Sequence, residues 1–404
     1  FASRTRRMHK QRFILIGFND EAAPHFSEEV TAIIAAARTF SGGRRHHELV
    51  RHLLPANAVW IDITVPLDAV FARYESCGEV VVFASGDPLF FGFGATLRRR
   101  LPDAELQIFP TFHSLQTLAH RVGMPYDDMT TVSLTGRPWQ GLDCALIEGR
   151  PKIGLLTDRE HTPAAIAERL LSYGYTGYRM IVGERLGSRD AERVAEYSLD
   201  EAARRSFALP NCVMLHGVPR RAPLGIPDSA FEHLDGRAGM MTKMPIRLLA
   251  VSQLQLHAAR CFWDIGSCTG SVSIEARLQF PRVQVHAFEI RPEGERLLET
   301  NARRFGAPGI VFHGGDFLDA DFAALPAPDA VFIGGHGGRL AEIVARIASV
   351  QSEGARLVFN SVSDERSLLF VRAVEAYGYA VGASIRMAVD AYNPITVMQA
   401  IKQA

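Results

Sequence analysis

The sequence predicts an α/β fold with more than one domain. Short β-rich runs alternate with helical patterns: FILIGF precedes EEVTAIIAAARTF, EVVVFAS precedes FGATLRRRL, and KIGLLT precedes PAAIAERLLSYGY. Strict alternation of strand and helix is typical of parallel sheets that are covered on both faces. With 404 residues, of which 47% are hydrophobic, the chain has the length of two or three domains of roughly 100–200 residues each.

Local signals mark where individual helices begin and end. Thr162 is suited to cap a helix, Pro163 to occupy its first position, and Gly174 to end it. In the run SGDPLFFG, Asp87 is expected to cap the following helix and Pro88 to be its first residue.

A linker divides the chain into two halves. The stretch HGVPRRAPLGIP, residues 216–227, holds three prolines and two glycines and has no hydrophobic periodicity. We therefore predict a first domain at residues 8–218 with two lobes that divide near residue 110, a linker at 219–227, and a second domain at 228–404. Residues 1–7 precede Met8, and their status stays open.

Charge excludes one class of partner. Basic and acidic side chains both total 44, and the balance holds in each half: 27 basic and 25 acidic in residues 1–225, and 17 and 19 in residues 226–404. A dedicated nucleic-acid binder needs clustered Lys and Arg. A small or medium-sized ligand is expected instead.

Cysteine usage and hydropathy bear on location. The five cysteines are scattered, without a Cys-x-x-Cys pair, which argues against structural zinc and a disulfide framework and favours a reducing compartment. The apolar run Phe13–Ile16 is too short for a signal-peptide core or a membrane span. We therefore expect a cytoplasmic protein without a membrane partner. No group of His, Cys, Asp and Glu has convincing metal-site spacing, so no metal is expected.

The second half contains a strand, a glycine turn and a helix in CFWDIGSCTGSVSIEA, residues 261–276. About twenty residues later a second strand, residues 283–288, ends in Glu289, where an acidic side chain can accept hydrogen bonds from both hydroxyls of a ribose. This combination indicates a nucleoside cofactor. A strand-glycine-helix turn also occurs for packing reasons alone. We interpret Glu275, one turn into the helix, as a packing or capping residue. Asp264 either touches the ligand or supports the loop.

Steric reasoning narrows the cofactor. In the dinucleotide fingerprint Gly-x-Gly-x-x-Gly, the second glycine lets the backbone approach pyrophosphate, but here Cys268 and Ser271 stand at the second and third glycine positions. S-adenosylmethionine has a ribose and no phosphate, and it fits such a loop. Asp316 is expected near the adenine amine, Phe317 at its ring face, and Gly334 at the open carboxyl end of the central strand. The expected contacts are Gly266, Ser267, Cys268, Thr269, Gly270, Glu289, Asp316 and Phe317.

Several motifs in order carry a resemblance to a known family. The first half shows SGDPLFFG, then TFHSLQ, LTGRP, LTDREHTP and residues 182–194, and it resembles the tetrapyrrole methyltransferases of corrin synthesis. The second half, from GIPDSAFEH through WDIGSCTGSVSIEA to DAVFIGG, resembles the decarboxylating methyltransferase domain of the same pathway. Together they are similar to the two-domain, decarboxylating C-methyltransferases of that pathway.

The resemblance implies a fold and two cofactor sites. It implies a two-lobed tetrapyrrole methyltransferase fold of class III, followed by a Rossmann-like domain of class I, each with its own S-adenosylmethionine. It also implies methylation of carbons 5 and 15 of a precorrin-type tetrapyrrole, loss of carbon dioxide from the acetate on carbon 12, and self-association through the second domain. In the first half the family's cofactor contacts fall on Gly86, Asp87, Pro88, Leu89, Ser114 and Leu115. In the second half the resemblance adds Thr242.

A substrate with many carboxylates calls for basic side chains in its clefts. The candidates are Arg44, Arg45, His46, His47, Arg137 and Lys243, each of which can equally belong to a solvated face. His336 and Asn360 lie where strand ends are expected to meet the second site, and His336 has the chemistry to move protons near neutral pH. A loop histidine without a ligand is the alternative.

Two departures from the family pattern stand out. The loop at residues 17–24, GFNDEAAP, lacks the usual glycine-rich turn, which puts substrate fit at the first site in question. Cys268 stands where the family commonly has glycine, and we expect it to be tolerated. Two other functions remain open: an RNA methyltransferase with an accessory domain, and a catalytic second half served by a first half that only binds tetrapyrrole.

Overall fold

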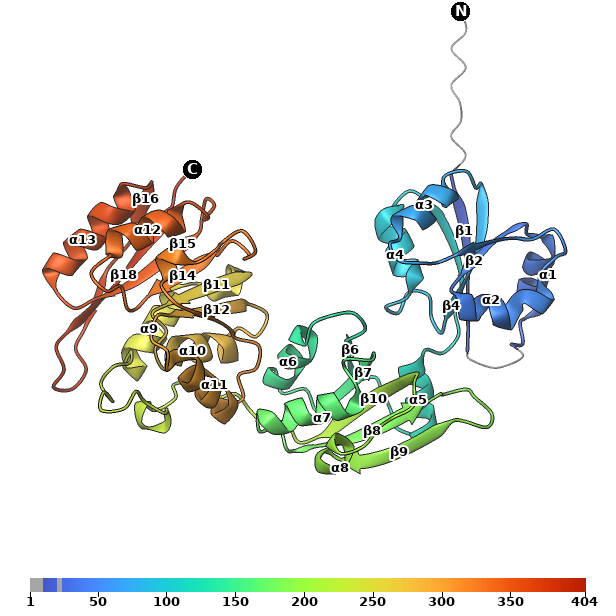
Figure 1. Cartoon of the computed structure of the whole chain (residues 1–404), viewed down its shortest axis with the longest axis horizontal. Helices are drawn as coiled ribbons and strands as arrows, with labels where there is room; N and C mark the ends of the chain where they lie inside the picture. The colour runs from blue at the N-terminus through green and yellow to red at the C-terminus, as the bar shows by residue number, and fades with distance from the viewer. Residues whose placement is uncertain (1–9, 20–23) are drawn as a thin grey trace, which may run out of the picture. The chain divides into compact units, whose positions relative to one another are not determined.

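The computed structural model describes residues 10–19 and 24–404, and these form two compact units. The first unit consists of the described residues up to Gly136 together with Lys152–Ile166 and Arg179–His216. The second unit consists of Arg137–Pro151, Ala167–Tyr178 and Gly217–Ala404. The described residues build three sheets, each with helices nearby in the chain (Figure 1), and the predicted α/β class is confirmed.

The first sheet is wholly parallel, with strand order β3-β2-β4-β1-β5. Successive residues of β1 face opposite sides: Phe13 and Leu15 pack with α3 and α4, whereas Ile14 and Ile16 pack with α1 and α2. The carboxyl ends of the five strands therefore lie at one edge. The elements are β1 Arg12–Phe18, α1 Glu28–Ala36, β2 Thr39–Gly42, α2 Arg44–Val50, the 3-10 turn η1 Arg51–Leu53, β3 Val59–Asp62, α3 Asp68–Tyr74, β4 Glu79–Ser85, α4 Phe93–Arg100 and β5 Glu105–Phe109.

The predicted helix start at Pro88 is wrong. The Asp87 carboxylate accepts a hydrogen bond from the backbone N–H of Leu89, 2.9 Å away, and so closes a local turn instead of capping a helix. The chain passes through a left-handed residue, Phe91 with φ 53°, and α4 begins at Phe93 with Gly92 at its N-cap.

The second sheet is mixed, with order β6-β7-β10-β8-β9. Its pairs β7–β10 and β8–β9 are antiparallel, so the prediction of strictly parallel sheets is wrong here. No helix lies between β8 and β9 to carry the chain back to the starting end of the sheet. The elements are α5 Ser114–Val122, β6 Thr130–Ser133, β7 Lys152–Leu156, β8 Tyr178–Glu184, β9 Arg193–Ser198, α8 Leu199–Ala203 and β10 Asn211–Gly217.

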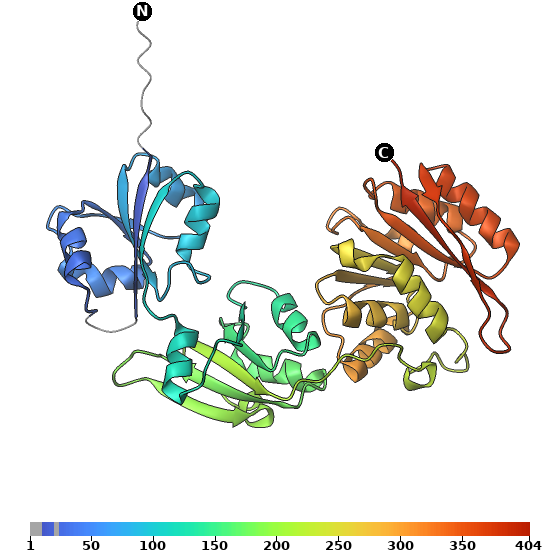
Figure 2. The same cartoon turned by 180° about the vertical axis from the view of Figure 1, so that it is seen from behind.

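The third sheet has eight strands, with order β13-β12-β11-β14-β15-β18-β16 and β17 paired to β18. The five strands β13, β12, β11, β14 and β15 run parallel, and β18 is antiparallel to each of its partners. Helices α9, α10 and α11 cover one face, and α12 and α13 cover the other (Figures 1 and 2). The elements are the 3-10 turn η2 Asp228–Ala230, α9 Met244–Gln253, η3 Leu256–Ala258, β11 Cys261–Ile265, α10 Ser271–Gln279, β12 Gln284–Glu289, α11 Gly294–Phe305, β13 Val311–Gly314, η4 Phe317–Asp319, β14 Ala330–Ile333, α12 Leu340–Ala348, β15 Arg356–Ser361, α13 Asp364–Glu375, β16 Tyr379–Val381, β17 Ile385–Met387 and β18 Ile395–Lys402.

Two segments from the first half of the sequence belong to the second unit. They contain α6 Gln140–Ile147 and all but the first turn of α7 Pro163–Ser172. Within this unit Ile147 packs in one apolar cluster with Phe231 and Phe305. At the start of α7, the Thr162 hydroxyl accepts from the backbone N–H of Ala165 at 3.1 Å, and the predicted cap is confirmed.

Candidate active sites

A cleft opens in the first unit at the carboxyl edge of its parallel sheet. Its volume is about 580 Å³, and its walls come from the loops after β1, β2 and β4, from the start of α5, and from segments next to β8 and β10. Four of the predicted site residues line it: Gly86, Ser114, Arg45 and His46. Phe90, Phe91 and Phe112 add apolar surface. The carboxyl edge of parallel strands is the usual place for a ligand in such sheets.

Glycines allow the backbone to close tightly around this cleft. A Cβ at Gly17 would lie 1.9 Å from the carbonyl oxygen of Gly86, and a Cβ at Gly86 would lie 2.9 Å from the Cα of His113. Gly86 also has φ +60°, a conformation that side-chain-bearing residues rarely adopt. The strand ends and the segment leading into α5 can meet only because glycine stands at these two positions.

Two neutral histidines line the same cleft. Nδ1 of His46 accepts from the backbone N–H of Gly43 at 3.2 Å, so Nε2 carries the proton and donates to the Ser85 hydroxyl at 2.9 Å. Burial, aided by neighbouring Arg45, lowers the pKa of His46 to about 4. Burial also lowers the pKa of His113 to about 4, and its ring stacks on Phe90 with centroids 3.6 Å apart. The cleft therefore offers polar groups without protonated imidazoles.

The other predicted residues of the first site lie outside the cleft lining. Leu115, in the first turn of α5, has its side chain buried in the core, and Leu89 is exposed on the turn after β4. Arg44 pairs with Glu48 at 3.4 Å on an exposed face, and His47 stacks on Trp60 with centroids 4.2 Å apart. The structure places Asp87 and Pro88 in the turn itself, and Arg137 in the second unit. Of the loop at residues 17–24, positions 20–23 lie outside the described residues.

The second site is built around the glycine turn after β11. Gly266 and Gly270 have φ +73° and +74°, and a Cβ at Gly266 would lie 2.4 Å from the backbone nitrogen of Gly335. Cys268 also has a positive φ, 48°. Its thiol donates to the carbonyl oxygen of Met240 at 3.2 Å. The turn therefore packs directly against the loop after β14, as two adjacent parallel strands require.

Two buried carboxylates hold this turn in place. Asp264 accepts from the backbone N–H and the hydroxyl of Ser273, at 3.1 and 2.6 Å, and burial raises its pKa to about 7. It therefore supports the start of α10. Glu289, at the end of β12, accepts from the backbone N–H of Cys268 at 2.8 Å and from that of Arg291 at 2.9 Å. This fixes the Glu289 carboxylate beside the glycine turn.

Three buried polar atoms at this edge have no hydrogen-bond partner in the described part of the chain. They are Ser267 Oγ, Thr269 Oγ1 and Asn360 Oδ1. Ser267 and Thr269 stand in the glycine turn, and Asn360 lies near the carboxyl end of β15. Buried polar groups normally find partners because leaving them unpaired is costly. Together with Glu289, they suit the hydroxyls and amino-acid group of S-adenosylmethionine.

The remaining predictions for this site fall on residues with structural partners. The Asp316 carboxylate accepts from the N–H of Leu318 at 2.9 Å and pairs with Arg339 at 3.0 Å. Phe317 is only 6% exposed and packs against Trp263. The Thr242 carbonyl accepts from Arg247 at 2.8 Å. Lys243 lies 4.0 Å from Asp228 and 4.8 Å from the ring centroid of Tyr392.

His336 has a partner that sequence reasoning missed. A guanidinium nitrogen of Arg366 lies 3.0 Å from its Nε2. Burial and this cation lower the pKa of His336. No local motif links the two residues. Only the order of strands in the sheet predicts that the two residues are close. It places the loop after β14, which carries His336, beside the end of β15, and α13 with Arg366 follows β15 in the chain.

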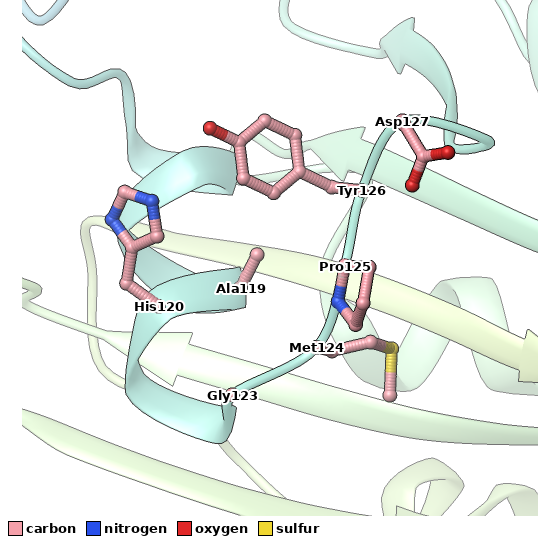
Figure 3. A pocket seen from close by; sticks show the side chains of 7 residues that line it. All are labelled: Ala119, His120, Gly123, Met124, Pro125, Tyr126 and Asp127. Atoms are coloured by element: carbon pink, nitrogen blue, oxygen red, sulfur yellow. The ribbon is translucent and has the colours of Figure 1, made fainter.

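A separate hollow of about 540 Å³ lies at the far end of α5 (Figure 3). Its lining runs from Ala119 and His120 to Gly123–Asp127, and the rings of His120 and Tyr126 lie 5.7 Å apart. It contains none of the predicted site residues. In the described part of the chain no group of three or more His, Cys, Asp or Glu residues is arranged to hold a metal, and no helix is long and apolar enough to cross a membrane.

Comparison with known proteins identifies the family. The family described as tetrapyrrole (corrin/porphyrin) methylases matches residues 14–203, and the precorrin methyltransferase domain matches residues 229–404. The precorrin-6Y C(5,15)-methyltransferase (decarboxylating) of Sinorhizobium sp is 34% identical, and the match covers 96% of this chain and 93% of that protein. The chain belongs to the precorrin-6Y C(5,15)-methyltransferase (decarboxylating) family.

Two further matches each cover part of this methyltransferase. The cobalt-precorrin-6B C(15)-methyltransferase (decarboxylating) of Salmonella typhimurium is 42% identical over 132 residues, which are 33% of this chain and 67% of that protein. A crystal structure of precorrin-6Y C5,15-methyltransferase from Geobacter metallireducens GS-15 is 30% identical and covers 45% of this chain and 100% of that one, with a TM-score of 0.41.

Proposed function

We propose that this methyltransferase transfers methyl groups from S-adenosylmethionine to carbons 5 and 15 of a precorrin-6-type tetrapyrrole and removes carbon dioxide from the acetate on carbon 12. The observation that carries the proposal is the nearly full-length match to a relative named for this reaction. The two sites described above, each at the carboxyl ends of parallel strands, support it.

In this proposal the chain's own residues bind and orient the cofactor and the substrate. S-adenosylmethionine supplies an activated methyl group on its sulfonium when bound. In the second unit, Glu289 with Ser267 and Thr269 holds the polar groups of the cofactor. In the first unit, the cleft walls at Gly86 and Ser114 hold a second molecule.

Alignment carries the catalysis, because the macrocycle's own carbons are the nucleophiles. Holding reactants in line is worth roughly 7–11 kcal/mol for well-oriented groups. The two thiols beside the sites stay protonated: burial raises the pKa of Cys212 to about 12 and raises that of Cys268. Neither thiol is available as a thiolate that would compete for the methyl group.

We assign methylation of carbon 15 and decarboxylation to residues 228–404, and methylation of carbon 5 to residues 8–218. This assignment is supported by a relative named for C(15)-methylation and decarboxylation, which matches 132 residues, a third of this chain. We also propose a cytoplasmic location, which fits the absence of disulfides among the five cysteines, and self-association through residues 228–404.

The test is the mass of the product formed from precorrin-6Y and S-adenosylmethionine. The intact chain adds two methyl groups and removes one carbon dioxide. Gly86→Val forces a Cβ against His113 and removes only one methylation, whereas Gly266→Val forces one against Gly335 and removes the other together with decarboxylation. Gly78→Val is the control, because nothing lies within 4 Å of a Cβ there.

The outcomes separate the alternatives. Two methylations that survive Gly86→Val show that the first half only binds tetrapyrrole. Transfer of methyl groups to RNA, with none to precorrin, overturns the proposal in favour of an RNA methyltransferase.

A further inference from the structure

Arg366 is a cation without a carboxylate partner at the edge of the second site. It lies in the first turn of α13 and is half-buried. None of the ion pairs among the described residues includes it, whereas Arg339, across the same edge, is paired with Asp316 at 3.0 Å and with Glu342 at 2.9 Å. Within the described chain, no carboxylate therefore lies at ion-pair distance from Arg366.

The neighbour of Arg366 is His336, whose ring contacts the guanidinium and accepts one backbone hydrogen bond. One guanidinium nitrogen lies 3.0 Å from Nε2 of His336 and 3.4 Å from Nδ1, and the backbone N–H of Gly338 lies 3.2 Å from Nδ1. A neutral imidazole has one acceptor nitrogen and one N–H. Because Nδ1 accepts from the N–H of Gly338, Nε2 carries the proton. The guanidinium nitrogen, which is close to both ring nitrogens, lies over the ring face, so the in-plane Nε2–H does not point at it, and no hydrogen bond in the described chain uses this N–H.

The guanidinium of Arg366 and the Nε2–H of His336 are two neighbouring donors, an arrangement suited to an anion. A carboxylate placed beside the two groups accepts from both, and guanidinium-carboxylate pairs are among the strongest hydrogen-bonded contacts. The ring is held in place for this: Phe359 packs edge-on against it with centroids 5.8 Å apart. The lowered pKa of His336 agrees with a ring that stays neutral and offers one N–H.

We propose that Arg366 and His336 form an anchor for a carboxylate side chain of the tetrapyrrole. The anchor deepens the proposed function and rests on it for the identity of the ligand. It gives His336 a positioning role through its N–H, in place of the proton transfer expected from the sequence.

The anchored carboxylate is not the one that leaves. Decarboxylation moves negative charge out of the carboxylate, so a cation that grips this group in the ground state loses the contact in the transition state and slows the step. An arginine pair is useful where the carboxylate keeps its charge throughout. The anchor therefore holds a spectator carboxylate and sets the orientation of the ring.

Kinetics of the full chain test this role. Arg366→Met raises KM for precorrin by roughly 10- to 100-fold, the effect of losing hydrogen bonds to a charged group, and leaves kcat for decarboxylation unchanged. Arg366→Lys keeps the charge and recovers part of the loss. Arg372→Met, on the exposed face of the same helix, matches the change in charge and leaves KM unchanged. Binding of S-adenosylhomocysteine, measured by calorimetry, is the same in all variants.

A readout without turnover separates this anchor from the proposed function. The imidazole C–H resonances of His336, assigned by their loss in His336→Asn, are followed by NMR as uroporphyrin III, which carries eight carboxylates, is added to the full chain. They shift with the free acid, do not shift with its methyl ester, and do not shift in Arg366→Met.

Two results overturn the anchor. One is a fall in kcat with KM unchanged in Arg366→Met, which makes Arg366 part of the chemistry. The other is unchanged kinetics together with unshifted His336 resonances. A wild-type chain that fails to turn over precorrin but still shows the carboxylate-dependent shift contradicts the proposed function and keeps the anion site.

Discussion

Cys268 has a backbone conformation that glycine adopts at lower cost. Its φ of 48° lies in the left-handed region, and strained residues of this kind cost roughly 1–3 kcal/mol. We expect Cys268→Gly to change the free energy of unfolding by less than about 1 kcal/mol, because relief of strain offsets the added freedom of the unfolded chain. Cys268→Val, with a β-branched side chain, should destabilise by about 1–3 kcal/mol.

Comparing Cys268→Gly with Cys268→Val separates the effect of the backbone conformation from the effect of losing the thiol, because both variants lose the contact with Met240. Urea unfolding gives the stabilities, and calorimetry with S-adenosylhomocysteine reports whether the turn still binds. Equal stability of the two variants would show that the left-handed conformation carries no cost.

Asp264 makes stability depend on pH in the opposite sense to most carboxylates. Burial raises its pKa from 3.8 to about 7 in the folded chain. Between these values the folded state keeps a proton that the unfolded state has released, so rising pH destabilises the folded state until the pH exceeds about 7. Asp264→Asn keeps the acceptor for Ser273 and removes this titration.

The measurement is urea unfolding of wild type and Asp264→Asn at pH 5 and pH 8. The free energy of unfolding of the variant, relative to wild type, should increase with pH. A difference that stays constant between the two pH values would mean that Asp264 titrates at an ordinary carboxyl value.

At the scale of elements, a buried ion pair ties α9 to α10. Nε of Arg247 lies 2.8 Å from a Glu275 oxygen, and both side chains are fully buried. The other Glu275 oxygen accepts from the N–H of Gly225 at 2.7 Å. The pair therefore also holds the segment before η2 against the helix that begins at the glycine turn.

Removing one member should leave a buried charge without its partner. Arg247→Met is expected to cost about 3–5 kcal/mol, and Arg247→Met/Glu275→Gln should recover part of this because the charge is gone while the amide oxygen still accepts from Gly225. Arg282→Met is the control, since that side chain is 80% exposed and pairs with Glu148 at the surface. A double variant no more stable than Arg247→Met would contradict this account.

The sequence predicts a structural feature well when the residues that determine it lie close together in the chain. The turn at Gly266 and the cap at Thr162 are set by residues a few positions apart, and both lie where expected. The helix predicted to begin at Pro88 does not form there. An aspartate side chain can either cap a helix or close a turn, and Asp87 closes a turn by accepting from the N–H of Leu89. The antiparallel placement of β18 and the contact of Arg366 with His336 join residues thirty or more positions apart, and no pattern in either segment reports them.

At the scale of the molecule, the boundary of the folding units differs from the boundary of the sequence motifs. The family matches end at residue 203 and begin again at residue 229. The compact units instead group α6 and most of α7 with the second half of the chain. Asp143 of α6 is 1% exposed; its carboxylate accepts two hydrogen bonds from Arg169, at 2.7 and 2.8 Å, and lies 3.9 Å from the buried Arg277 of α10.

This buried cluster predicts that a change in α6 destabilises the second unit. Asp143→Asn leaves two cations facing each other without their shared anion, and we expect a loss of about 3–5 kcal/mol in the free energy of unfolding. Hydrogen exchange should speed up at the amides of α10, which carries Arg277. Asp127→Asn, at an exposed position, changes the charge equally and should stay within about 0.5 kcal/mol of wild type. Unchanged exchange in α10 of Asp143→Asn would contradict the coupling, whatever the total stability.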